Sequence, residues 1–585
     1  MIETPVSSPA AERFSAQQAV TAGTDYAELK ASPQGLFWNE FRPQDGACRI
    51  WQWRNGQARC LTPDGFSARS RVYEYGGGSF CLGEDALVFV NEADQQLYAQ
   101  AFDASAPRAL TQGQCRYGDL RWAAGKVLAV EETHGPDGAE HRLVSISTTG
   151  AREVLAEGAD FYAAPTLSAD GQRLAWIEWS RPAQPWTATR LLCAERLGAH
   201  GWSEARCVAG AATQAESLQQ PRFDANGRLY CLSDRNGYWQ PWGETPVGWA
   251  ALPAEQADHA GAPWQLGAST WLPLGDGGYV ASWFEGGFSR LGMRHASGAT
   301  QDFSDAYSRF RCLDIDDDYL YSIVASAISL PAVIAIDRRS HQVQVLAGGE
   351  LPLPSERISR PHSLTYPSGD GVAHGFFYPA MDGATTPPLV VFVHGGPTSA
   401  CYPVLDPRIQ YWTQRGFAVA DLNYRGSTGY GRDYRQALHL HWGERDVEDA
   451  CAAVTHLAGL GLIDPHKAFI RGGSAGGYTT LCALAFHDVF RAGASLYGVS
   501  DPIALSRATH KFEGDYLDWL IGDPLQDAER YRARTPLLHA AQIKVPVIFF
   551  QGELDAVVVP EQTRLMLDAL KENGIAAEGH FYAGE

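Results

Sequence analysis

The sequence has 585 residues, 45% of them hydrophobic and 19% charged, which is an ordinary globular composition on a chain too long for one domain. Its 47 basic and 67 acidic side chains give a net charge of −20, which argues against nucleic acid or an anionic membrane as a partner. It has no apolar run of 18 residues and no signal-peptide pattern, and its eleven cysteines are scattered without a Cys-x-x-Cys pair. These features predict two or three domains and a cytoplasmic location with reduced thiols.

Residues 36–350 are predicted to form an all-β propeller domain. Short apolar runs with many Trp and Tyr residues follow Gly, Asp and Asn turns, as at 168–177 and 224–232. The units recur at roughly the 40–50 residues of a four-stranded blade, which gives about seven blades. They begin near residues 36, 72, 117, 160, 216, 264 and 308. A pair of β-sandwiches is the alternative, and residues 1–35 are predicted to be an N-terminal extension that packs partly on the second domain or frays.

One segment of the propeller region is unusual, because residues 73–78 read Tyr-Glu-Tyr-Gly-Gly-Gly. Three successive glycines indicate a bulge or the close approach of another backbone. Glu74 could face a cavity between the domains and receive the amino group of a peptide, or it could be a buried structural acid. The sequence does not decide between these interpretations, so Glu74 is not counted as a site residue.

Residues 351–585 are predicted to form an α/β-hydrolase domain with a doubly wound, mostly parallel sheet. The apolar run at 388–393 predicts a strand buried on both faces, and His-Gly-Gly-Pro follows it. A glycine turn at this place lets backbone N–H groups point at a carbonyl oxygen, so Gly395 or Gly396 is predicted to contribute to an oxyanion hole. His394 is predicted to hold this loop and not to act as a base.

A second strand, predicted at 417–422, leads into the Gly-rich segment 423–431. A phosphate-binding loop is conceivable from its composition, but the Gly-Lys-Ser/Thr ending of such loops is missing. The segment is therefore predicted to shape the wall of the active site. Arg425 within it either contacts the substrate or pairs with an acid.

Residues 472–476 read Gly-Gly-Ser-Ala-Gly and fit the Gly-x-Ser-x-Gly nucleophile elbow. A short apolar strand at 468–470 precedes them, and a helix rich in Ala and Leu is predicted at 478–486. Ser474 is therefore predicted to be the nucleophile on a tight strand-to-helix turn. The N–H group of Ala475 is predicted to be the second oxyanion-hole donor, because it lies at a helix N-terminus, which favours negative charge.

The apolar run at 545–550 predicts another buried strand, and an acid lies just past its end. Asp555 is predicted to orient a histidine, with Glu553 as the rival acid. In hydrolases with this elbow the histidine follows the acid in the chain. His580 lies inside the last predicted strand and is predicted to be structural. The general base is expected just after Glu585, so the hydrolase domain is predicted to be C-terminally incomplete in this sequence.

Taken together, these motifs resemble the prolyl oligopeptidase family of serine peptidases, within it the bacterial acylaminoacyl-peptidase and dipeptidyl-peptidase-like branch. The resemblance is specific over roughly 365–585 and is carried by residues 394–397, 423–431, 442–449, 472–478, 551–555 and 581–585. It implies a serine nucleophile at 474, an acid at 555 and a histidine beyond 585, because in the family the last of these motifs runs into Gly-His-Gly. It also implies an N-terminal propeller.

The predicted function is hydrolysis of peptide bonds in short peptides through a Ser-Asp-His triad and an acyl-enzyme. No His or Cys cluster has metal-ligand spacing, so neither a metal nor a cofactor is expected. An esterase on the same fold and a catalytically inert binding protein are the alternatives. The sequence does not fix whether cleavage follows proline, removes dipeptides or releases an acylated residue. It is compatible with a homo-oligomer without indicating one.

Overall fold

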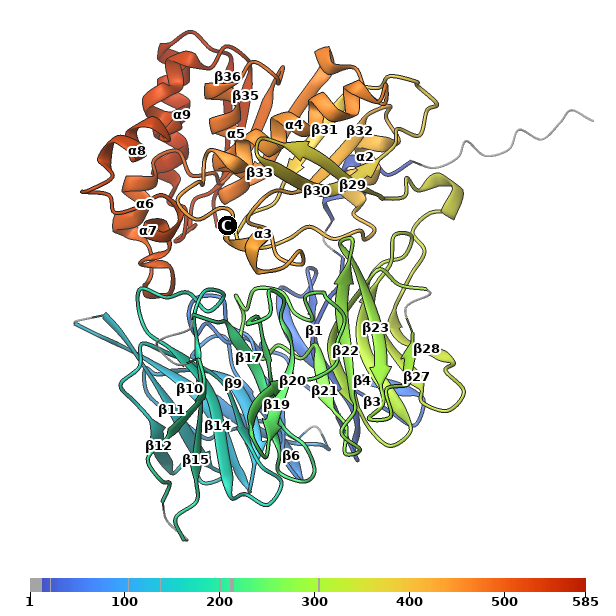
Figure 1. Cartoon of the computed structure of the whole chain (residues 1–585), viewed down its shortest axis with the longest axis vertical. Coiled ribbons are helices and arrows are strands. Elements are labelled where there is room, and N and C mark those ends of the chain that lie inside the picture. Colours follow the sequence, from blue (N-terminus) through green and yellow to red (C-terminus); the bar gives the residue numbers. More distant parts are fainter. Residues whose placement is uncertain are drawn as a thin grey trace, which may run out of the picture.

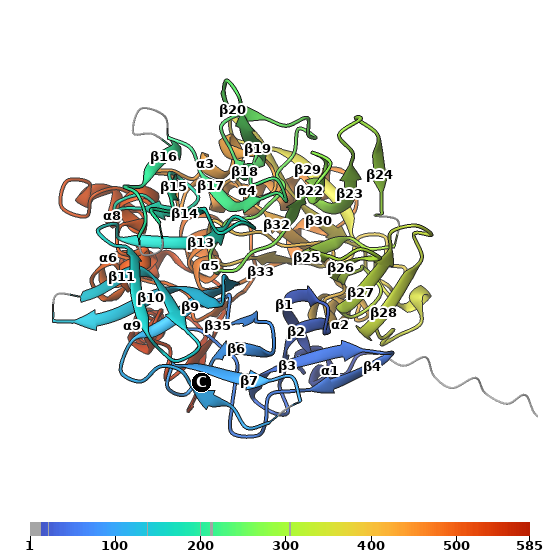
Figure 2. The same cartoon turned by 90° about the horizontal axis from the view of Figure 1, so that it is seen from below.

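The computed structural model describes residues 13–21, 23–103, 105–136, 138–198, 201–210, 215–303 and 306–584. The described chain forms two parts, a propeller (blue to green) and a hydrolase part (yellow to red) that lies over one end of it (Figure 1). Seen from below, the propeller sheets are arranged around a common centre (Figure 2).

The propeller contains seven sheets, and each consists of four strands that are consecutive in the chain. The first four sheets comprise β1 (Asp25–Ser32), β2 (Gly35–Arg42), β3 (Ala47–Arg54) and β4 (Gln57–Cys60); β5 (Phe80–Leu82), β6 (Ala86–Val90), β7 (Leu97–Ala101) and β8 (Arg108–Ala109); β9 (Arg116–Ala123), β10 (Lys126–Gly135), β11 (Gly138–Ser147) and β12 (Arg152–Ala156); and β13 (Phe161–Leu167), β14 (Arg173–Trp179), β15 (Arg190–Glu195) and β16 (Arg206–Ala209). The last three comprise β17 (Leu218–Phe223), β18 (Leu229–Ser233), β19 (Gln240–Thr245) and β20 (Gly248–Ala251); β21 (Trp271–Pro273), β22 (Tyr279–Glu285), β23 (Phe288–Arg294) and β24 (Thr300–Asp302); and β25 (Arg309–Ile315), β26 (Tyr319–Ala325), β27 (Ala332–Asp337) and β28 (Val343–Gly348). The predicted seven-bladed propeller is therefore confirmed, and the β-sandwich alternative is wrong because the sheets form a ring.

The first blade begins earlier than predicted. β1 starts at Asp25 and pairs with β2 along its length, although residues 1–35 were expected to form a separate extension. Tyr26 and Leu29 are buried against Trp38, and this burial holds the strand in the blade. The sequence prediction begins the blade at residue 36, although Gly23 and Asp25 mark a turn at the start of β1.

The first and last blades close the ring by side-chain packing and a few polar contacts. Because every sheet holds only consecutive strands, no strand is shared between these two blades. Trp38 of the first blade belongs to the same apolar cluster as residues of the last. The N–H of Ala31 donates to Asp314 at 2.7 Å, and Arg311 donates to Asp25 at 2.8 Å.

The hydrolase part is built on one eight-stranded sheet in the order β29-β30-β32-β31-β33-β34-β35-β36. Its strands are β29 (His362–Ser368), β30 (Gly371–Tyr378), β31 (Leu389–Val393), β32 (Ala418–Asn423), β33 (Ala468–Gly473), β34 (Gly493–Leu496), β35 (Val547–Gly552) and β36 (Ala577–Tyr582). From β32 onward along this order the neighbouring strands are parallel. All five residues of β31 are buried, as expected for a strand covered on both faces. The predicted α/β-hydrolase sheet is confirmed.

The α-helices are α1 (Ala16–Val20), α2 (Pro407–Thr413), α3 (Arg432–Gln436), α4 (Arg445–Gly459), α5 (Ala475–Phe486), α6 (Pro502–Ala508), α7 (Tyr516–Leu520), α8 (Ala528–Ala533) and α9 (Pro560–Glu572). Short 3₁₀ helices lie at Ser355–Arg357, Pro465–Lys467, Lys511–Glu513 and Pro536–Gln542. Across the described ranges, no helix is both long and apolar enough to cross a membrane. The eleven cysteines are all free thiols.

The segment that precedes β1 packs on the hydrolase part. The N–H of Phe14 donates to the side chain of Gln414 at 2.8 Å, and Arg415 donates to the carbonyl oxygen of Phe14 at 2.7 Å. The ring of Phe14 is buried beside Leu405. Phe14 therefore ties the segment before β1 to the residues that flank α2 in the hydrolase part.

Candidate active site

Ser474 lies on the turn between β33 and α5, as the elbow motif predicts. Its φ of 53° and ψ of −119° are an unusual conformation for a residue other than glycine. The turn is tight, because a Cβ atom at Gly472 would lie 2.2 Å from the carbonyl oxygen of Gly476. A Cβ atom at Gly476 would lie equally close to the carbonyl oxygen of Val393. Side chains at either glycine would therefore push the turn off the sheet and displace the serine.

The loop after β31 lies directly beside this turn. A Cβ atom on Gly395 would lie 3.5 Å from the Cβ of Ser474. In the described part of the chain, the backbone N–H groups of Gly395, Gly396 and Ala475 donate no hydrogen bond. Gly396, Ala475 and Ser474 line the same cavity. Free N–H groups beside a serine at a helix N-terminus are suited to bind an oxyanion.

His394 holds this loop. Its Nδ1–H donates to the carbonyl oxygen of Gly395 at 2.7 Å, and the hydroxyl of Ser427 donates to its Nε2 at 2.8 Å. Its ring stacks on Tyr424 with the ring centroids 4.4 Å apart. Burial lowers the pKa of His394 to about 4, so the ring is neutral at pH 7. With both ring nitrogens engaged, the side chain fixes the position of Gly395.

Asp555 lies just beyond the end of β35. Its Oδ1 accepts the N–H groups of Val557 and Val558, both at 2.9 Å, which fixes the carboxylate. Its Oδ2 accepts no hydrogen bond from any described residue, so it is available to a further donor. The rival acid, Glu553, forms an ion pair with Arg564 at 3.4 Å on the surface.

Among the residues that the structure describes, no histidine is hydrogen-bonded to the Ser474 hydroxyl. None of these histidines is therefore identified as the general base. His580 lies in β36, as predicted. It forms an ion pair with Glu578 at 3.0 Å and stacks on Phe550 with the ring centroids 5.3 Å apart. These contacts account for His580 as a structural side chain of the last strand.

A cavity of about 850 Å³ lies between the propeller and the hydrolase part, with Ser474 in its wall. This volume suits a short peptide. The apolar residues that the hydrolase part contributes to it include Trp442, Val499, Leu505, Tyr516, Leu517, Leu520, Val557 and Val558. The charged residues that line it are Asp25, Glu28, Arg69, Arg309, Arg311 and Glu513. None of these side chains was identified from the sequence, because they come together only when the two parts dock.

A propeller loop directly contacts the loop that follows β31. The indole N–H of Trp264 donates to the carbonyl oxygen of Thr398 at 2.7 Å, and the N–H of Thr398 donates to the hydroxyl of Tyr516 at 3.1 Å. Next to Trp264, Leu266 pairs with Gly77 in a short parallel bridge. A Cβ atom on Gly77 would lie 2.2 Å from the carbonyl oxygen of Leu266, so the predicted close backbone approach at 73–78 is confirmed.

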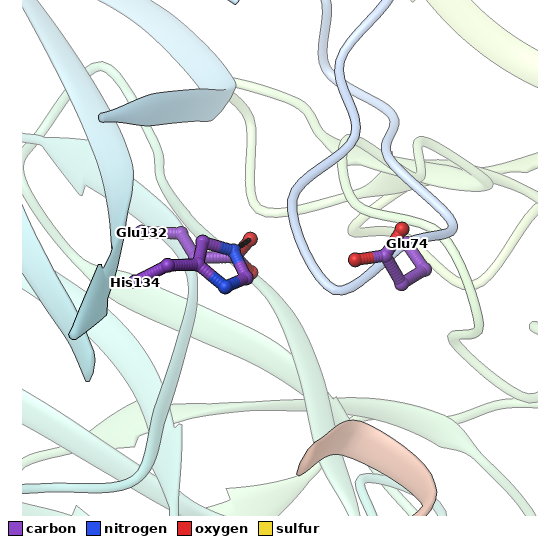
Figure 3. Close-up of side chains that lie close together, drawn as sticks. All are labelled: Glu74, Glu132 and His134. Carbon is purple, nitrogen blue, oxygen red and sulfur yellow. Dashed lines mark hydrogen bonds and ion pairs between the residues drawn. The ribbon is translucent and has the colours of Figure 1, made fainter. Parts of the chain in front are cut away.

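Glu74 does not line the cavity. It lies with Glu132 and His134 in a cluster whose possible ligand atoms are within 4.8 Å of one another (Figure 3). Arg116 occupies the same cluster, with Nη1 at 2.7 Å from Glu74 and 3.2 Å from Glu132. The arginine supplies the positive charge that the carboxylates need, so the cluster is explained as an ion-pair network. Neither interpretation of Glu74 holds, because it does not line the cavity and its side chain is 40% exposed; it is a paired surface acid of the propeller.

The pKa of Glu132 leads to a testable effect on stability. Burial alone would raise this pKa, but hydrogen bonds from His141, the Tyr73 N–H and His134 lower it to about 2. A carboxyl whose folded pKa lies below its unfolded value of 4.5 stabilises the fold above that value and loses the effect as the pH falls toward 2. We expect Glu132→Gln to lower the free energy of unfolding at pH 7 by about 3 kcal/mol, with the difference narrowing below about pH 4.5.

Urea unfolding of the wild type and the Glu132→Gln variant at pH 7, 4 and 3 measures this difference. Glu140→Gln is the matched control on the neighbouring strand, because Glu140 is exposed and pairs only with Arg142. Its effect should stay below about 1 kcal/mol. A Glu132 effect that is small at pH 7, or that does not change with pH, would contradict the assignment.

The segment 423–431 has a different role from the one predicted. None of its residues lines the cavity, so it does not shape the wall around Ser474. It contacts the propeller, where the N–H groups of Gly429 and Gly431 donate to Asp258 at 3.2 and 2.9 Å. It therefore joins the two parts and does not contact a ligand in the cavity.

Arg425 pairs with acids, which was one of its two predicted roles. Its side chain is 4% exposed and lies 2.8 Å from both Asp449 and Asp370, with Glu448 also in contact. These partners engage the guanidinium fully within the hydrolase part. Arg425 is therefore a structural residue.

Comparison with known proteins identifies similar sequences and structures. Residues 403–585 match the sequence profile described as the prolyl oligopeptidase family. The chain is 28% identical over 267 residues to the uncharacterized peptidase YuxL of Bacillus subtilis, which covers 45% of this chain and 40% of that protein. It is 32% identical over 209 residues to dipeptidyl aminopeptidase BIII of Pseudoxanthomonas mexicana, which covers 34% of this chain and 30% of that protein. These alignments thus span less than half the length of the curated relatives.

Two solved structures are similar over nearly the whole chain. A puromycin-hydrolyzing peptidase of Mycobacterium tuberculosis is 33% identical, with a TM-score of 0.92 over 98% of this chain and 92% of that chain. A puromycin hydrolase is 30% identical, with a TM-score of 0.91 over 98% of this chain and 93% of that chain. The similarity therefore includes the propeller as well as the hydrolase part.

Proposed function

The chain belongs to the prolyl oligopeptidase family of serine peptidases, and from that premise we propose that it hydrolyses peptide bonds in short peptides, with Ser474 as the nucleophile. The observation that supports this most directly is the position of Ser474. It lies on a strained elbow, beside unpaired N–H groups, in the wall of a peptide-sized cavity. Puromycin hydrolysis is an activity of the similar solved proteins and is one candidate reaction among those to be tested.

In the proposed mechanism, the Ser474 oxygen attacks the carbonyl carbon of the scissile bond and its proton passes to a histidine. The developing oxyanion is bound by the N–H of Ala475 and by that of Gly395 or Gly396, of which Gly396 borders the cavity. The C–N bond then breaks, and the histidine gives its proton to the leaving amine. Water hydrolyses the acyl-enzyme by the same steps in reverse order, while Asp555 stabilises the imidazolium.

We propose that this histidine follows Glu585. β36 runs parallel to β35, and Tyr582 pairs with Gly552, after which the chain leaves the sheet at the edge where Asp555 lies. The unoccupied Oδ2 of Asp555 could accept the Nδ1–H of a histidine placed there. Intact mass and a C-terminal peptide map of the protein from its natural source test this, since a histidine should be found shortly after Glu585. A mature protein without one would favour the inert binding protein.

The substrate class is tested by comparing turnover of short peptide anilides with turnover of p-nitrophenyl esters by the full-length protein. We expect both to be hydrolysed, with peptides preferred, because an acyl-enzyme forms from either. Ester hydrolysis with no cleavage of any peptide would favour the esterase alternative. No turnover of either would favour a non-catalytic protein.

The propeller over the cavity predicts selection by size. A flexible pentapeptide can enter the space between the two parts, whereas a folded protein must first open a segment locally. Local opening that costs about 3 kcal/mol makes the accessible form about 100-fold rarer. We expect a labelled pentapeptide to be cleaved at least about 100-fold faster than the same sequence within a folded domain. Equal rates, measured by mass spectrometry of the products, would contradict this selection.

A further inference from the structure

The last propeller blade places a cation without an anionic partner in the wall of the cavity. Arg309 is the first residue of β25 and lines the same cavity as Ser474. Its guanidinium lies over the ring of Tyr402, and its Nη1 is buried without a hydrogen-bond partner. In the part of the chain that the structure describes, no carboxylate forms an ion pair with it. Burial and the nearby Arg311 lower the pKa of Arg309, while Tyr402 raises it.

The other charged residues of the cavity wall differ from Arg309 in this respect. The two arginines form ion pairs, Arg311 with Asp25 at 2.8 Å and Arg69 with Glu92 at 3.4 Å. The two glutamates accept hydrogen bonds, Glu28 from the N–H of Ser79 at 2.7 Å and Glu513 from the hydroxyl of Tyr75. Among the arginines that line the cavity, Arg309 is thus the one that has no carboxylate partner among the described residues.

A guanidinium with a buried Nη1 that lacks a partner is costly to the fold, and an anion that enters the cavity would offset the cost. A guanidinium binds a carboxylate through two parallel N–H···O bonds, and an arginine stacked on an aromatic ring is already oriented to do so. The cavity wall continues from the loop that follows β31 to Arg309, because Gly396, Pro397, Ser399 and Tyr402 all line it. A peptide held at Ser474 would extend along this wall.

We propose that Arg309 binds a carboxylate of the peptide substrate, and that short peptides with a carboxylate inside the cavity are the preferred substrate class. This inference rests on the proposed peptidase function of the same cavity. The carboxylate is either the C-terminus of the peptide or an acidic side chain. In either case Arg309 determines specificity and takes no part in the bond-breaking steps.

The proposal is tested by measuring peptide binding, so the result does not depend on peptide turnover. Isothermal titration calorimetry measures Kd for tri-alanine and for its C-terminal amide, on full-length protein that carries Ser474→Ala. We expect the free acid to bind about 10- to 100-fold more tightly than the amide. Adding Arg309→Met should abolish this preference, and Arg309→Lys should retain part of it, because a lysine keeps the charge without the bidentate geometry.

Arg311→Met is the matched control, since it removes the same charge from the same cavity and strand. It should keep the preference for the acid, because Arg311 is already paired with Asp25. Loss of the preference in both variants to the same degree would mean a diffuse electrostatic effect and would overturn the proposal. Equal binding of acid and amide with Arg309 intact excludes the peptide C-terminus as the carboxylate that Arg309 binds, and the proposal then depends on an acidic side chain. If neither peptide binds, the result contradicts both the role of Arg309 and the proposed peptidase function.

Two further peptides distinguish the sources of the carboxylate. Ala-Ala-Glu amide and Ala-Ala-Gln amide differ only in a side-chain charge and both lack a free C-terminus. If Arg309 binds a side chain, the Glu peptide binds more tightly and Arg309→Met removes the difference. If Arg309 binds the C-terminus, these two amides bind alike while the tri-alanine acid keeps its advantage. Absence of every Arg309-dependent difference contradicts the proposal.

Discussion

Replacing Ser474 by alanine is expected to lower kcat for peptide hydrolysis by about 10⁴- to 10⁶-fold. The hydroxyl is the atom that forms the acyl-enzyme, and no other described side chain occupies its place on the elbow. Substrate binding should change little, because the Cβ of alanine fits the same turn. The measurement is kcat and KM on a peptide anilide with the full-length protein, together with labelling by a fluorophosphonate probe, which the variant should lose.

Ser506→Ala is the matched control for this variant. Ser506 lies in α6, and its hydroxyl only donates to the carbonyl oxygen of Ile503 in the same helix. Its removal should leave kcat within about twofold of the wild type, since surface changes of this kind cost less than about 0.5 kcal/mol. Activity that survives in Ser474→Ala to within tenfold would mean that another residue is the nucleophile.

Breaking the buried ion pair between the two parts is expected to cost about 3–5 kcal/mol of unfolding free energy. Asp234 lies between β18 and β19 of the propeller, and it contacts Arg432 and Arg435 of α3 in the hydrolase part. The side chains of Asp234 and Arg435 are both 0% exposed, so neither could turn to water if the other were lost. Asp234→Asn keeps the shape and removes the charge, which leaves two arginines facing an amide.

Urea unfolding followed by circular dichroism measures this loss, and hydrogen exchange of residues 427–436 localises it. Arg532→Gln is the matched control, because its pair with Glu529 is exposed, at 63% and 88%. It should cost at most about 1 kcal/mol. If Asp234→Asn is no more destabilising than this control, the buried cluster does not hold the two parts together.

The elements that sequence reasoning recovered are those defined by neighbouring residues. A blade is a meander of four consecutive strands, so its turns mark it locally, and the hydrolase strands are marked by their apolar runs. Ser474 and Asp555 follow the ends of such runs, where parallel sheets place reactive groups. Gly395 and Gly396 follow the same logic. β1 is missed because its burial depends on Trp38 and the last blade, which a local pattern does not show.

The residues that sequence reasoning could not recover depend on contacts far apart in the chain. Arg309 and Trp264 come from different blades and reach the cavity only through the docking of the two parts. Glu74 was a reasonable candidate for the cavity, but Arg116 of β9 draws it into an ion-pair network. The segment 423–431 follows a strand at the edge of the sheet where Ser474 lies, yet Asp258 of the propeller binds it. Such pairings are set by tertiary structure, and no local pattern encodes them.

The closure of the propeller has a mechanical consequence. At every other junction the chain itself crosses from one blade to the next, but the first and last blades touch only through side chains and a few polar bonds. Because no chain connection crosses the contact between the first and last blades, this contact is where the propeller ring would open first. The segment around Phe14 is anchored to α2 of the hydrolase part, whose own chain continues from the last blade. This segment therefore links the first blade to the last blade through the hydrolase part. The hydrolase part that covers the propeller thus also helps to keep the ring of blades closed.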